Sequence, residues 1–106
     1  MLDPEIGNII RRFIRALSER GVRIEKVLLY GSFASGNIHA GSDLDLAIVS
    51  PDFGKDRFEE GKMLNRMAWR IDPRIEAIPL SSDSFENDTW VPLIHEIRSK
   101  GIEVRP

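Results

Sequence analysis

Cysteine is absent from the 106-residue sequence, which excludes disulfide bonds and thiolate metal sites. No apolar run approaches the roughly 20 residues that a membrane-spanning helix needs. The amino terminus lacks a basic segment followed by an apolar block, so we expect no secretion signal. The formal net charge is only −2, which gives no bulk electrostatic reason to expect direct nucleic-acid binding. Together these absences predict a cytoplasmic protein without membrane contact.

The composition is typical of a folded, globular domain. Apolar residues make up 42% of the sequence and charged residues 30%, which is unlike the composition of a disordered chain. The length fits one domain, and the sequence contains no internal repeat, low-complexity tract or linker. We therefore expect residues 1–106 to form a single domain.

The spacing of apolar residues predicts the secondary structure. Apolar residues three and four positions apart predict three helices, within residues 4–21, 55–71 and 93–100. Short apolar or alternating runs predict four strands, at residues 26–30, 43–49, 74–78 and 102–104. Pro79 is expected to end the third strand, and the polar residues 81–89 are expected to form a loop. This mixture predicts an α/β (α+β) fold, with a small mixed sheet and helices on one face.

Two carboxylates stand at the start of the second predicted strand. Because alternate side chains of a strand point to the same face, Asp43 and Asp45 are expected to lie close together. Their charges repel, and an unpaired buried carboxylate is costly. Magnesium would relieve this repulsion, since it prefers oxygen ligands and typically joins one or two carboxylates to substrate phosphates.

A glycine and a serine follow the first predicted strand. Gly31 allows the backbone to approach a ligand closely. If a short helix begins at Ser32, its first N–H groups and the serine hydroxyl can donate to a phosphate. The segment is not a P-loop, because Asn37-Ile38 stands where that motif requires lysine and serine or threonine.

Glu76, on the third predicted strand, is flanked by apolar residues. If this strand lies beside the second one, Glu76 reaches the same metal cluster as Asp43 and Asp45. It would then ligate one of two metals and help to deprotonate an attacking hydroxyl. Asp72 is a weaker alternative, because it stands where a helix is expected to end, before Pro73.

The order of these residues resembles a known family. Gly31-Ser32, a gap, and then Asp43-Leu44-Asp45 resemble the signature of the polymerase-beta-like nucleotidyltransferase superfamily. Gly36 and Ser42 extend the resemblance to its small prokaryotic members, the minimal nucleotidyltransferases. The resemblance covers roughly residues 27–78 and implies the fold of that family, a mixed sheet with helices on one side.

The resemblance also implies a site and a reaction. Gly31, Ser32 and Ser42 would bind a nucleoside triphosphate, while Asp43, Asp45 and Glu76 would be catalytic and hold two magnesium ions. The reaction would transfer a nucleoside monophosphate, AMP from ATP, to an acceptor hydroxyl. The short chain leaves acceptor binding to a partner or to a second copy in a homodimer. The family suggests a small helical HEPN-type toxin, which such antitoxins can adenylylate.

Plainer interpretations remain open at this stage. Asp43 and Asp45 could be solvated acids at an exposed strand start, and Glu76 could be a surface residue paired with Arg74. Ser35 departs from the family pattern, in which many relatives carry an arginine that could meet phosphate. The alternative function is therefore a non-catalytic binding module that neutralises a HEPN-type partner by occlusion.

Overall fold

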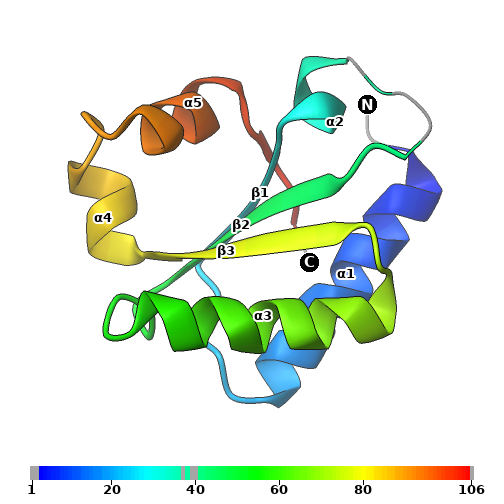
Figure 1. Ribbon diagram of the computed structural model, residues 1–106, viewed down its shortest axis with the longest axis horizontal. Coiled ribbons are helices and arrows are strands. Elements are labelled where there is room, and N and C mark those ends of the chain that lie inside the picture. Colours follow the sequence, from blue (N-terminus) through cyan, green and yellow to red (C-terminus); the bar gives the residue numbers. More distant parts are fainter. Residues whose placement is uncertain (1–2, 37, 39–40, 106) are drawn as a thin grey trace.

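The computed structural model describes residues 3–36, 38 and 41–105. Its elements follow in the order α1 Pro4–Glu19, β1 Lys26–Tyr30, α2 Ser32–Ser35, β2 Leu44–Ser50, α3 Arg57–Ile71, β3 Ile75–Ser81, α4 Ser82–Asn87, α5 Pro92–Lys100 and β4 Ile102–Glu103 (Figure 1). No helix in the described part of the chain is long and apolar enough to cross a lipid bilayer.

The four strands form one mixed sheet in the order β3-β2-β1-β4. β2 runs antiparallel to β1 and parallel to β3, and β4 pairs antiparallel with β1. The carboxyl end of β1 therefore lies beside the amino ends of β2 and β3, at one end of the sheet. The register at this end places Tyr30 opposite Asp45, and Asp45 opposite Glu76.

Helices α1 and α3 cover one face of the sheet. Asp3 caps α1 by accepting a hydrogen bond from the Glu5 N–H at 2.8 Å, and Pro4 occupies the first helical turn. The apolar stripe of α1, with Phe13 and Leu17 fully buried, packs with Leu64 of α3 against alternate residues of β1, β2 and β3. This larger core fixes the central strands that carry the candidate site.

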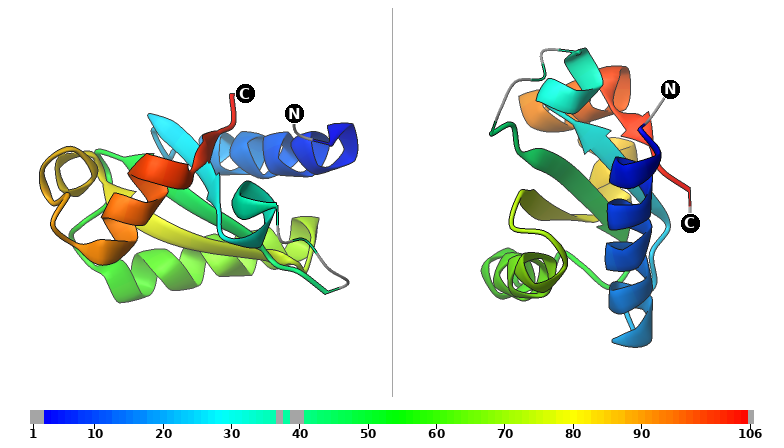
Figure 2. Two further views of the ribbon diagram at one scale, coloured as in Figure 1. Left: turned by 90° about the horizontal axis from the view of Figure 1, so that it is seen from above. Right: turned by 90° about the vertical axis from the view of Figure 1, so that its right-hand side faces the viewer.

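The opposite face is covered over only part of its length. The short helices α4 and α5 pack Phe85, Ile94 and Ile97 against the other set of alternate strand residues. Figures 1 and 2 show these two helices at one end of the sheet, while α2 lies near the amino end of β2. The predicted mixed sheet is confirmed, and the helices on this second face add a layer that the sequence did not predict.

Two local predictions are wrong. Residues 81–89 are not simply a loop, because α4 occupies Ser82–Asn87 and is capped by the Ser81 hydroxyl, which accepts from the Ser84 N–H at 3.0 Å. Pro79 does not end β3, which continues to Ser81. β3 is an edge strand, and the Ala77 N–H faces away from β2 toward Asn65. Pro79 lies two residues further, so its missing N–H falls on the same open edge and breaks no sheet hydrogen bond.

Candidate active site

Three polar side chains form a row across the sheet, at the end where β1 stops and β2 and β3 begin. Tyr30, Asp45 and Glu76 occupy adjacent positions on three neighbouring strands and share one face. This is the face that α4 and α5 leave partly uncovered. Parallel pairing of β2 with β3 is what brings Glu76 beside Asp45, as expected if the two strands were neighbours.

The Asp45 carboxyl is held in an unfavourable environment for a negative charge. Its pKa is raised from 3.8 to about 6, chiefly because burial removes solvent from the carboxylate. The charges of Glu76 and Asp43 raise the pKa further, as does a side-chain hydrogen bond with Glu76. Both neighbouring carboxylates therefore act on Asp45, and a cation placed beside it would relieve the repulsion.

Gly31 connects the turn after β1 to this carboxylate. Its backbone has φ of 73°, in the left-handed region that favours glycine. A β-carbon at this position would overlap the Asp45 Oδ2 atom. The absence of a side chain at Gly31 is therefore what allows the turn and Asp45 to lie against each other.

The remaining candidate nucleotide-binding residues, Ser32 and Ser42, lie directly after Gly31 and shortly before Asp45 in the chain. Helix α2 begins at Ser32, as the phosphate-binding hypothesis required, and the Gly31 carbonyl accepts from the N–H groups of Ala34 and Ser35 at 3.1 and 3.0 Å. Ser32 is half-buried, and Ser42 is buried directly before Asp43. The segment between them includes residues 37, 39 and 40, which lie outside the described part of the chain.

The acids fit a hard divalent cation by their chemistry, although they are not arranged as a finished ligand set. Among the described residues, no three His, Asp or Glu side chains are grouped closely enough to hold a metal ion as they stand. Asp43 and Glu76 are both exposed, and both act on the partly buried Asp45 carboxyl. Three carboxylates beside a turn that tolerates no side chain suit magnesium and an anionic substrate.

The alternatives considered for the acids are less consistent with the geometry. Arg74 forms an ion pair with Asp72 at 2.9 Å, with a second hydrogen bond to the same carboxylate, so Arg74 is not engaged by Glu76. Asp72 ends α3 and its charge is satisfied by that arginine. Glu76 is therefore the acid on β3 that faces Asp45.

Tyr30 is a site residue that the sequence analysis assigned only to a strand. Its pKa is raised to about 12, first by burial and then by the charges of Asp45, Glu76 and Glu96. The neutral hydroxyl is thus placed among carboxylates from both the sheet and α5. The signal available from the sequence was the position of Tyr30 directly before Gly31, which an antiparallel pairing with the second strand places opposite Asp45.

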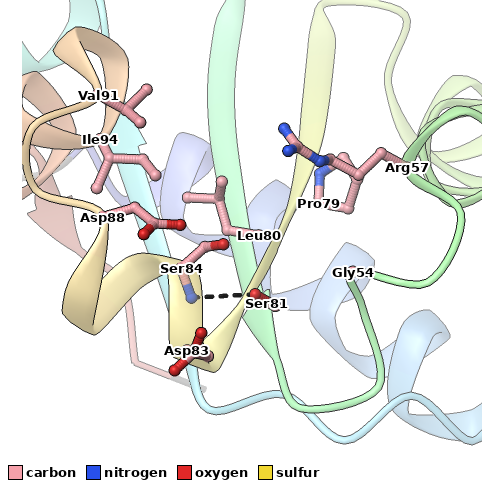
Figure 3. Close-up of a pocket in the computed structure, with 10 residues that line it drawn as sticks. All are labelled: Gly54, Arg57, Pro79, Leu80, Ser81, Asp83, Ser84, Asp88, Val91 and Ile94. Atoms are coloured by element: carbon pink, nitrogen blue, oxygen red, sulfur yellow. Dashed lines mark hydrogen bonds between the residues drawn. The ribbon is translucent and has the colours of Figure 1, made fainter.

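A cavity of about 290 Å³ lies at the other end of β3 and is separate from these acids (Figure 3). Arg57 borders it from α3, while Leu80 contributes from β3, Ser84 from α4, Asp88 from the turn between α4 and α5, and Ile94 from α5. Its described lining contains none of the candidate site residues. We therefore place the candidate chemistry at the Gly31–Asp45 contact.

The chain belongs to the nucleotidyltransferase domain family, which its sequence matches over residues 10–91. It is similar to the protein adenylyltransferase MntA of Shewanella oneidensis, with 25% identity over 73 residues, which cover 69% of this chain and 52% of the relative. The chain thus matches about half the length of that relative.

Solved structures share the fold at low sequence identity. One is a crystal structure from Sulfolobus solfataricus that is assigned to the nucleotidyltransferases. Its TM-score is 0.69 at 16% identity, and the match covers 93% of this chain and 78% of that chain. A toxin–antitoxin structure with AMP-PNP has a TM-score of 0.62 at 20% identity, covering 93% and 72%. A mutant MntA–HpeT toxin–antitoxin structure has a TM-score of 0.60 at 18% identity, covering 90% and 71%.

Proposed function

We propose that this domain is a magnesium-dependent nucleotidyltransferase that transfers AMP from ATP to an acceptor hydroxyl and releases pyrophosphate. The contact between the Gly31 turn and Asp45 carries the proposal, because it brings a close backbone approach to a carboxylate on which two further acids act. In the reaction, the acceptor oxygen bonds to the α-phosphorus as the bond to the bridging oxygen breaks. The acceptor's proton leaves and pyrophosphate departs with the electron pair of the broken bond.

The roles of the residues follow from their chemistry. Asp43, Asp45 and Glu76 would hold two magnesium ions, which supply electrostatic stabilisation of the phosphate charge when bound. Gly31 and the hydroxyls of Ser32 and Ser42 would position the triphosphate. Glu76 is exposed at the start of β3, and its carboxylate would help to take the proton from the acceptor hydroxyl.

The acceptor that we favour is a hydroxyl on a small helical HEPN-type protein. Two observations support it: the sequence similarity to the adenylyltransferase MntA and the fold shared with a chain of each of two toxin–antitoxin structures. A second copy of this chain, in a homodimer, is the other candidate to complete the acceptor site. Because the reaction needs ATP and magnesium, we place it in the cytoplasm.

The alternative function is a binding module that neutralises its partner by occlusion without transferring nucleotide. Ser35 favours this alternative, since many relatives carry an arginine there. The three acids also lack a finished ligand arrangement in the described residues. Against it stands the raised pKa of Asp45, because a carboxyl group in such an environment has no evident structural purpose.

Incubation with magnesium and ATP labelled at the α-phosphate separates the two functions. The purified chain is tested alone and with the product of the adjacent gene. Label on either protein that is lost in Asp43→Asn and in Asp45→Asn supports transfer. Label that persists in both variants contradicts the assigned site, and an inhibited but unlabelled partner supports occlusion.

A further inference from the structure

The cavity at the end of β3 away from the acids carries charges of both signs on opposite walls. Arg57 lines it from α3, and Asp88 lines it from the turn between α4 and α5. Figure 3 shows their charged groups on either side of Leu80. In the described part of the chain, neither side chain has an ion-pair partner. Asp88 is half-buried, and a carboxylate that is partly removed from water without a partner is unfavourable.

Local contacts hold both walls in place. Gly54, in the loop after β2, has φ of 108°, and a β-carbon there would lie 3.0 Å from the Ser81 β-carbon. The glycine therefore allows this loop to lie against the end of β3. On the other wall, the Ser84 N–H donates to the Ser81 hydroxyl at 3.0 Å, and Asn87 donates to Asp83 at 2.7 Å. The cavity is thus formed before a ligand arrives, as is usual for small-molecule sites.

The surface between these charges is apolar. The buried side chains of Leu80 and Ile94 line the cavity together with the half-buried Val91. The volume of about 290 Å³ lies at the lower end of the roughly 300–1,000 Å³ that small-molecule sites occupy. The cavity therefore suits a ligand of amino-acid size with an aliphatic middle better than it suits a nucleotide.

The charges of the lining decide between classes of ligand. The described lining holds one arginine, Arg57, and two aspartates, Asp83 and Asp88, so one negative charge remains in excess. The two carboxylates repel a purely anionic ligand such as phosphate, and Arg57 repels a purely cationic one. A ligand with a carboxylate at one end and an ammonium group at the other pairs with both walls.

We propose that this cavity binds a basic amino acid, with its carboxylate on Arg57, its side-chain ammonium on Asp88 and its aliphatic stem on Leu80. The guanidinium group suits the first contact because its parallel N–H donors match a carboxylate. Such a ligand carries one net positive charge, which offsets the excess negative charge of the lining. Its binding does not depend on nucleotidyl transfer. A free amino acid and a basic residue at the carboxyl terminus of another protein present these same groups.

Titration of the isotope-labelled protein with L-lysine, followed through the backbone amide signals of Leu80, Ser84 and Val91, tests the proposal. We expect saturable shifts of these signals. Leucine lacks the side-chain ammonium and cadaverine lacks the carboxylate, so each should bind about tenfold or more weakly than lysine. A tripeptide that ends in lysine distinguishes the two sources. Tighter binding than that of lysine identifies a protein terminus as the ligand, and weaker binding identifies the free amino acid.

Two variants test the assigned contacts separately. Arg57→Gln should weaken lysine binding about tenfold or more, and should not weaken the binding of cadaverine, which has no carboxylate. Asp88→Asn should weaken the binding of lysine and cadaverine, but not that of leucine. Arg66→Gln on α3 and Glu86→Gln on α4 are the matched controls, because they remove the same charges from exposed residues outside the described lining.

Both controls should leave the affinity for lysine nearly unchanged, and circular dichroism checks that each variant is folded. The proposal is overturned if lysine produces no saturable shifts at the cavity amides, or if leucine or cadaverine binds as tightly as lysine. It is also overturned if Arg66→Gln weakens lysine binding as much as Arg57→Gln does.

Discussion

Gly31 and Asp45 lie in direct contact, so close that a β-carbon on Gly31 would overlap the Asp45 carboxylate oxygen. One residue ends the turn after β1 and the other stands near the start of β2, fourteen positions later in the chain. The antiparallel pairing of these strands brings them together, with Tyr30 opposite Asp45. The candidate site therefore depends on glycine at this position for steric as well as conformational reasons.

Gly31→Ala should damage both the stability and the site. The alanine side chain must adopt φ of 73° and must also displace Asp45. We expect the free energy of unfolding to fall by about 2–3 kcal/mol, from backbone strain together with the steric overlap. Urea denaturation measures the loss of stability. Magnesium bound at the acids should raise the Tm of the wild type, and this rise should be absent in Gly31→Ala.

Gly36→Ala is the matched control. Gly36 has φ of 83°, yet nothing lies within 4 Å of the added β-carbon. This variant should therefore show the backbone strain alone, about 1 kcal/mol. Equal losses of stability in the two variants would show that the overlap with Asp45 has no energetic consequence.

The raised pKa of Asp45 predicts a specific pH dependence of stability. A carboxyl with pKa 3.8 in the unfolded chain and about 6 in the folded one binds more protons when folded. The free energy of unfolding should therefore decrease as pH rises from about 4 to about 6. Asp45→Asn should remove this decrease and stabilise the protein at neutral pH by an amount on the order of 1 kcal/mol, after allowance for solvent screening.

Denaturation of wild type and variant across this range supplies the measurement. Asp52 and Asp72 do not obscure it, because Arg23 and Arg74 lower the pKa of these carboxyls and shift their effect to more acidic solution. Asp43→Asn removes one of the charges that raise the pKa of Asp45. It should therefore narrow the pH range over which the free energy of unfolding falls. A wild type and an Asp45→Asn variant with parallel pH profiles would contradict the assigned environment.

Glu76→Gln should separate binding from turnover. If Glu76 helps to deprotonate the acceptor, transfer should fall by about 10²-fold or more while triphosphate affinity changes little. Glu96→Gln is the control, because Glu96 also acts on Tyr30 but lies on α5 rather than in the row of acids. A larger loss of transfer in Glu96→Gln than in Glu76→Gln would show that Glu76 is not the third acid of the site.

Asn65 and Ala77 exchange two hydrogen bonds, of 2.8 and 2.9 Å, that fasten α3 to the open edge of β3. Asn65→Asp keeps the acceptor for the Ala77 N–H but places a carboxylate against the Ala77 carbonyl. We expect a loss of about 1–3 kcal/mol in the free energy of unfolding. Asn87→Ala, which removes an exposed bond to Asp83, should cost far less. Thermal denaturation compares the two.

The order and type of most elements were predictable, because the spacing of apolar residues along the chain indicates helices and strands directly. The buried stripe of α1 and the apolar run of β1 and β2 gave the elements and their order. Pro79 and residues 81–89 were misassigned, because proline is acceptable on an edge strand and a short capped helix has little apolar pattern. The sequence contains no local signal for which strand lies at the edge.

The candidate site was partly predictable for a similar reason. Asp43 was predicted on the strand with Asp45, but β2 begins at Leu44 and Asp43 lies just before it. The charge of Asp43 nevertheless acts on Asp45, whose pKa it raises. The pairing of Asp45 with Glu76 and the contact with Gly31 depend on strand order and register, which are long-range properties. Tyr30 and Glu96 were missed because burial and the position of α5 determine their closeness to the acids.

A crystal soaked with manganese and a non-hydrolysable ATP analogue tests the central claim most directly, because manganese can be located by anomalous scattering. The account predicts metal bound between the carboxylates of Asp43, Asp45 and Glu76, with the triphosphate against the turn at Gly31-Ser32. Metal bound elsewhere, or a triphosphate that leaves this turn untouched, would contradict it.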